Sequence, residues 1–137
     1  MKNTVQIDTG RPEALQTIAD VDKAAAITAA CKAVAGIAPK ATIEMIDYNG
    51  RFASRGPFRR YVEIRFGLFA QEGGTTPEAI IEAMQQVDDA TLADAIAHQL
   101  GKLAGEDYQG YVATKRIGVG KKVEGRVADI RMQLALI

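Results

Sequence analysis

Residues 59–70 read Arg59-Arg-Tyr-Val-Glu-Ile-Arg-Phe-Gly-Leu-Phe-Ala70 and decide the fold class. Val62, Ile64, Phe66 and Leu68 alternate here with Tyr61, Glu63 and Arg65. A period of two with a mixed outer face is typical of a strand that is buried on one side and wet on the other. The stretch therefore predicts an antiparallel sheet that helices cover on one face.

Further strands are predicted on both sides of this stretch. Residues 41–48, Ala-Thr-Ile-Glu-Met-Ile-Asp-Tyr, are predicted to be a strand, and Asn49-Gly50 after it is a strong hairpin-turn dipeptide. Near the end of the chain, 109–118 and 123–137 are also predicted to be strands. In the last of these, the apolar residues Ala128, Ile130, Met132, Leu134 and Leu136 alternate with Asp129, Arg131 and Gln133.

Helical patterns occupy the remaining segments. Residues 11–37 are rich in alanine, carry Pro12 in the first turn and end at Gly36, which predicts one continuous helix. Thr75 with Glu78 makes a capping box for a second helix, and Asp88-Asp89 separates that helix from a third, which ends near Gly105.

The predicted fold is thus a single α+β domain over residues 1–137, with 1–10 as a flexible arm or short edge strand. We expect an antiparallel sheet of four to five strands, with an N-terminal helix and a later helix pair packed on one face. A chain of 137 residues is long enough for one such core.

Composition narrows the class of protein. Lys plus Arg and Asp plus Glu number 17 each, so net charge does not favour nucleic acid or membrane. One cysteine cannot form an internal disulfide, and no apolar run is long enough for a membrane span or follows Met1 as a signal peptide would. We expect a protein of the host-cell cytoplasm or of a virion.

Residues suited to covalent catalysis are few. The chain has one histidine (His98), one cysteine (Cys31) and one serine (Ser54), in contexts that do not form a triad. Asp88, Asp89 and Asp94 at a helix start are more typical of caps than of metal ligands. Gly118-x-Gly120-Lys121 lacks the remaining positions of a dinucleotide or P-loop motif and indicates a hairpin loop. We predict no enzyme, cofactor or metal.

Charge is segregated along the chain. Residues 51–65 hold five arginines against one acid, whereas 72–107 hold eight acids against one base, Lys102. The candidate interaction surface comprises these basic and acidic side chains: Arg51, Arg55, Arg59, Arg60, Arg65, Lys115, Arg116, Lys121, Lys122, Arg126, Asp88, Asp89 and Asp94. Opposite charges on one neutral chain favour self-association into a homo-oligomer such as a ring.

Three alternatives stay open beside self-association. Both charged regions could be solvated faces that keep a neutral protein soluble. The basic loops could instead bind nucleic acid, or inhibit an enzyme that acts on it, through Arg51, Arg55, Arg59, Arg60, Lys121 and Lys122, with Phe52, Phe58 and Tyr61 stacking on bases. A small enzyme that uses carboxylates alone would need Asp47, or Asp88 and Asp89, to converge in a pocket.

The order of elements resembles the tail terminator proteins of long-tailed bacteriophages. The resemblance is carried by the strand at 61–69, the acidic helical stretch after it and the closing segment Arg126-Val-Ala-Asp-Ile-Arg-Met-Gln-Leu-Ala-Leu-Ile137. It covers most of the chain, transfers no site residue, and does not account for the continuous N-terminal helix or the long basic hairpin. It implies a non-enzymatic, ring-forming virion protein that caps the tail tube and meets the head connector.

Overall fold

The computed structural model describes residues 13–47, 61–118 and 125–136, and it is an α+β protein, as predicted. Residues 1–10, the hairpin dipeptide Asn49-Gly50 and the loop at Gly120-Lys121 lie outside the described residues. In chain order the elements are α1 (Glu13–Gln16), α2 (Asp20–Ala35), β1 (Lys40–Asp47), β2 (Tyr61–Phe69), α3 (Pro77–Gln86), α4 (Asp89–Ala104), β3 (Tyr108–Ile117) and β4 (Arg126–Leu136).

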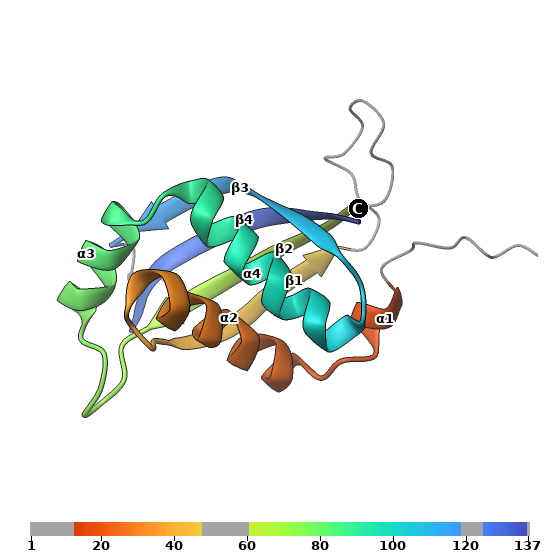
Figure 1. The fold of residues 1–137 in the computed structure, drawn as a ribbon. Helices are drawn as coiled ribbons and strands as arrows, with labels where there is room; N and C mark the ends of the chain where they lie inside the picture. Colours follow the sequence, from red (N-terminus) through yellow and green to blue (C-terminus); the bar gives the residue numbers. More distant parts are fainter. Residues whose placement is uncertain (1–12, 48–60, 119–124, 137) are drawn as a thin grey trace, which may run out of the picture.

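The four strands form one antiparallel sheet in the order β1-β2-β4-β3. The helices α2, α3 and α4 lie together on one face of this sheet, and we call them the helical layer (Figure 1). None of the described helices covers the opposite face, which we call the helix-free face. The prediction of one antiparallel sheet with helices packed on one side is confirmed.

The core lies between the sheet and the helical layer. Val62, Ile64, Phe66 and Leu68 of β2 are buried, as their alternation predicted. The apolar positions of β4 from Ala128 to Leu134 are buried beside them. Strand pairing aligns Phe66 with Ile130, so the buried side chains of the two central strands form continuous rows under the helices.

The predicted continuous helix at 11–37 is wrong, because the chain bends between α1 and α2. At this bend the Thr17 hydroxyl donates to the carbonyl of Ala14 at 2.8 Å, and the Thr17 and Ile18 amides bond three residues back. A threonine hydroxyl that bonds the preceding turn competes with the regular helical pattern, so the first helix ends here. The helix restarts at Asp20 and ends at Gly36, which adopts the left-handed conformation with φ 73°.

The later helix pair is confirmed, with one correction at its start. The N-cap of α3 is Thr76 and not Thr75, because the Thr76 side chain accepts from the Ala79 amide at 3.1 Å. Asp88 caps α4 by accepting from the amides of Ala90 and Thr91. The apolar spacing of α4 predicts that Leu92, Ile96, Leu100 and Leu103 all face the core; the first three are buried, whereas Leu103 is 41% exposed because the buried side of α4 continues through Gly101.

Candidate interaction surface: the helix-free face of the sheet

The helix-free face carries charged side chains from all four strands. The strand registers place on it Glu63 and Arg65 of β2, Arg126, Asp129 and Arg131 of β4, and Arg116 of β3, and the contact with Arg126 places Glu44 of β1 there as well. The apolar neighbours of these residues on β2 and β4 point into the core, so these two central strands contribute charge to one face only.

The two central strands pair their charges diagonally. Arg65 and Arg131 lie directly opposite each other. Two like charges in this position repel each other unless each has a counter-charge nearby. Arg65 instead donates from Nε and Nη2 to the two oxygens of Asp129 at 3.0 and 2.8 Å. Arg131 forms the matching ion pair with Glu63, at 3.0 Å between Nε and Oε2. Each arginine therefore finds its carboxylate on the opposite strand.

A third ion pair crosses β2 above a glycine. Arg126 of β4 donates from Nη1 to Oε1 of Glu44 of β1 at 2.6 Å, although β2 lies between these strands. A Cβ on Gly67 would come within 2.7 Å of the Glu44 carboxylate and 2.9 Å of Arg126 Cδ. The missing side chain at Gly67 thus leaves the space through which the two partners reach each other.

Burial differs between carboxylates and arginines in the two diagonal pairs, whereas in the pair across Gly67 the order is reversed, with Arg126 8% and Glu44 20% exposed. The Asp129 and Glu63 side chains are each only 6% exposed, whereas those of Arg65, Arg131 and Arg116 are 33%, 39% and 66% exposed. The sequence predicted a wet outer face, and the burial of Glu63, Asp129 and Arg126 corrects that expectation. The reason is that long arginine side chains lie over the shorter carboxylates. The face therefore directs guanidinium groups outward.

Asp129 holds this arrangement in its ionised form. Its hydrogen bonds from Arg65 are the main cause that lowers its pKa below the ordinary value, and burial opposes that shift. The Arg65 guanidinium gains from the same contact, and its pKa is raised. Ionised Asp129 therefore stabilises the folded state relative to the unfolded state.

We expect Asp129→Asn to destabilise the fold by about 2 kcal/mol at neutral pH, the range of hydrogen bonds to charged groups. Because the folded-state pKa is lowered, the wild type keeps the full contribution of Asp129 above the unfolded-state pKa of about 3.9 and loses it as pH falls through the folded-state pKa. Urea unfolding from pH 7 to pH 2.5 should show the two curves converging at the acidic end. A constant difference over this range would contradict the assignment.

The structure places the neighbouring bases Lys115 and Arg116, both members of the candidate surface, on opposite faces of the sheet. Arg116 lies on the helix-free face, 3.9 Å from Asp129. Lys115 turns to the helical side, where it donates to the Val87 carbonyl at 2.9 Å and pairs with Asp89 at 2.7 Å. Adjacent residues of a strand point to opposite faces, so these two bases do not form one patch.

The remaining predicted site residues lie in different structural environments. Arg65 and Arg126 are engaged in ion pairs within the chain, Asp88 caps a helix, and Asp94 is exposed on α4. The residues Arg51, Arg55, Arg59, Arg60, Lys121 and Lys122 lie outside the described residues.

Four members of the charged face were missed from the sequence: Glu44, Glu63, Asp129 and Arg131. The alternation in β2 and β4 does place Glu63, Asp129 and Arg131 on one side of the sheet, so this signal was available. The pairing was not, since the partners Arg65 and Asp129 are 64 positions apart and Glu44 and Arg126 are 82 apart.

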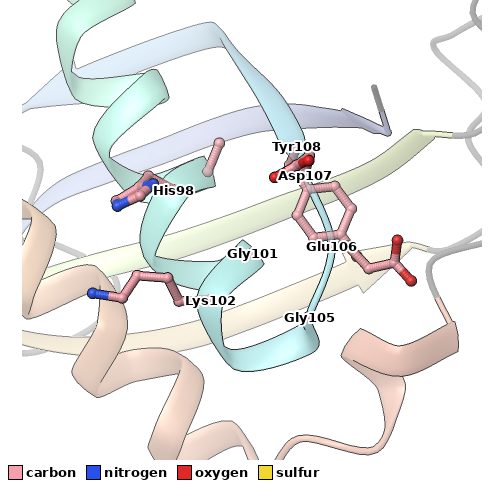
Figure 2. A pocket seen from close by; sticks show the side chains of 8 residues that line it. His98, Gly101, Lys102, Gly105, Glu106, Asp107 and Tyr108 are labelled. Atoms are coloured by element: carbon pink, nitrogen blue, oxygen red, sulfur yellow. The ribbon is translucent and has the colours of Figure 1, made fainter.

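A cavity of about 310 Å³ lies at the end of α4, lined among others by His98, Lys102, Glu106 and Tyr108. Figure 2 shows that the His98 ring and the Lys102 amine point to one side and the Glu106 carboxylate to the other. These groups therefore do not converge as an acid and a base would need to.

Cys31 and the acidic residues that the structure describes are not arranged for thiol or metal chemistry. Burial raises the pKa of the Cys31 thiol to about 12, so the reactive thiolate is disfavoured. No three His, Cys, Asp or Glu residues among those described are grouped as metal ligands would be. Asp89, one candidate ligand, is paired with Lys115.

Comparison with known proteins identifies no relative: no family model, no curated protein and no solved structure matches the chain. Within the described residues, no helix has the length and apolar character that crossing a membrane requires.

Proposed function

We propose that this chain is a non-enzymatic assembly protein that acts through protein–protein contacts with itself and with other virion proteins. Its role is that of a phage tail terminator or head–tail connector component, the class that its order of elements resembles. The observation that carries the proposal is a difference in exposed charge: carboxylates are exposed on α3 and α4, and the more exposed charged groups of the helix-free face are arginines.

Within the helical layer, α3 and α4 supply the acidic surface. Glu78 and Glu82 of α3 and Asp94 of α4 are exposed, and Lys102 is the single Lys or Arg within these two helices. On the opposite side of the domain, the helix-free face presents the exposed guanidinium groups of Arg65, Arg116 and Arg131. Complementary surfaces on opposite sides of one domain favour a head-to-tail contact between copies.

Glu82→Lys tests this contact. The wild type should form complexes larger than one chain, and the substitution should weaken association roughly tenfold by placing like charges in contact. Asp22→Lys is the matched control, because Asp22 is an exposed acid in the first turn of α2, at the end of the helical layer away from α3 (Figure 1). Sedimentation equilibrium measures both.

Salt provides an independent measurement of the same contact. Raising ionic strength from 0.15 to 1 M shortens the screening length from about 8 to about 3 Å, which should dissociate the wild-type complexes. A wild type that stays monomeric at every concentration and beside candidate virion partners would refute the proposed function.

Nucleic-acid binding is the alternative, and one observation favours it. Arg116 is 66% exposed and its nearest carboxylate contact is at 3.9 Å, so it could neutralise a phosphate. Arg65 and Arg126 support it less, since both already pair with carboxylates. Affinity for oligonucleotides that falls steeply with salt and decreases in Arg116→Ala would favour this alternative over self-association.

A further inference from the structure

The strand β3 forms one edge of the sheet. Its partner is β4, and no strand lies on its other side among the residues that the structure describes. Along such an edge, every second residue directs its N–H and C=O outward. These groups form a template on which another strand can add.

The two halves of β3 differ in how well they are protected from such pairing. In the second half, a register shift at Ala113 and the inward-facing Lys115 interrupt the edge, so backbone pairing is weaker there and the exposed Arg116 contributes through its side chain. From Tyr108 to Val112 the register is regular. Within this half Tyr111 is 38% exposed and lies on the helix-free face, although large apolar side chains are mostly buried in this protein.

Charge is arranged along this edge with opposite signs at the two ends. Glu106 and Asp107 directly precede β3, and Lys115 and Arg116 stand near its end. Tyr111 lies between the two ends, and the extra residue at Ala113 offsets the one-residue difference in its spacing to Asp107 and to Arg116. Two such strands that run antiparallel would set the acidic end of each beside the basic end of the other, with the two Tyr111 side chains facing each other.

We propose that β3 pairs with β3 of a second copy of this chain, antiparallel and around a two-fold axis near Tyr111. The two four-stranded sheets then become one continuous sheet, and the two helix-free faces lie side by side. This inference rests on the self-association part of the proposed function but uses a different surface. It deepens that function by naming the partner strand.

Pairing of β3 with β1, the other edge of the sheet, is less favourable. An antiparallel alignment over the full length of both strands would place Arg116, near the end of β3, beside Lys40 at the start of β1. Like charges directly opposite each other destabilise a strand pair. Charge along the strands therefore selects the two-fold arrangement.

A charge swap tests the pairing. In a two-fold dimer, Asp107→Lys and Arg116→Glu should each weaken dimerisation about tenfold, because each substitution acts twice. Mixing the two variants should restore a one-to-one dimer, since the new lysine then faces the new glutamate and the remaining Asp107 and Arg116 still face each other. Analytical ultracentrifugation of the full-length chain measures the three samples.

Two controls accompany the swap. Asp22→Lys and Lys32→Glu make the same charge changes on exposed positions of α2, which packs over β1, and both should leave dimerisation unchanged. Arg116→Glu also places a second acid near Asp129, so a thermal unfolding curve establishes that this variant folds.

Hydrogen exchange adds a readout that needs no substitution. The outward amides of β3 should exchange more slowly as the wild-type concentration rises and dimers form.

An oligomer that dissociates with Glu82→Lys but shows unchanged β3 exchange would overturn the edge pairing and keep the charged-face contact. Protected β3 amides with no effect of Glu82→Lys would keep the edge pairing and overturn the charged-face contact. Single variants that dimerise like the wild type, or a mixture that does not recover, would also overturn the edge pairing.

Discussion

Gly110→Ala is expected to destabilise the protein by about 3 kcal/mol, near the upper end of the usual cost of overpacking a core. A Cβ at this position of β3 would collide with the backbone carbonyl oxygen of Ala93 in α4 and lie 3.0 Å from Met132 Cε. The obstacle is backbone, so the helix has to move away from the sheet. Chemical denaturation with urea measures the loss.

Gly74→Ala is the matched control for this substitution. Gly74 lies in the exposed loop before α3, and a Cβ there would meet its nearest neighbour, Gln71 Cβ, at 3.4 Å, an ordinary contact. We expect its unfolding free energy to stay within about 0.5 kcal/mol of the wild type. A Gly110→Ala protein as stable as this control would contradict the close approach of α4 to β3.

The second large effect is expected from Glu44→Ala, at about 3 kcal/mol. The Arg126 side chain is only 8% exposed and pairs with Glu44 across Gly67, so the substitution would leave a buried guanidinium without its counter-charge. Removing one partner of a buried pair is costly for this reason. Glu72→Ala, which removes an exposed loop carboxylate, should change the stability by less than about 0.5 kcal/mol.

A double substitution distinguishes a lost ion pair from a lost side chain. Glu44→Leu with Arg126→Met replaces both charges by apolar groups of similar length and should recover most of the stability. Urea unfolding of the single and double variants gives the comparison. If Glu44→Ala costs no more than Glu72→Ala, the pair across Gly67 does not stabilise the fold. If the double variant is as unstable as the single one, the loss comes from packing around the side chains.

The elements of this fold were largely predictable, because their signals are local. Alternation in residues 59–70 gave β2 and its buried side, and Asp88 and Gly105 marked where α4 begins and ends. The prediction was wrong at two places where another local hydrogen bond competes with the expected one. Thr17 bonds the preceding turn and divides the N-terminal helix, and Thr76 caps α3 although only Thr75 has a glutamate three residues on, as a capping box requires.

The candidate surface was less predictable, and the β-bulges explain part of the difference. In β3, alternation from the buried Tyr108 through Val112 would place Arg116 on the helical side. The extra residue at Ala113 reverses the order, so Arg116 reaches the helix-free face and Lys115 turns toward Asp89. A similar register shift in β4 places Arg126 opposite Phe69 on the helix-free face. Such a shift depends on the partner strand, and a single-strand pattern does not contain it.

By itself, the sequence determined which segments are helices and strands and which side of each central strand is buried, since hydrophobic periodicity and end signals act within a few residues. Only the tertiary structure decided which charges meet. Glu44 reaches Arg126 across an intervening strand, Asp129 is enclosed by Arg65, and β3 is left at an edge. These contacts depend on strand order and register, which are set by packing between segments that are distant along the chain.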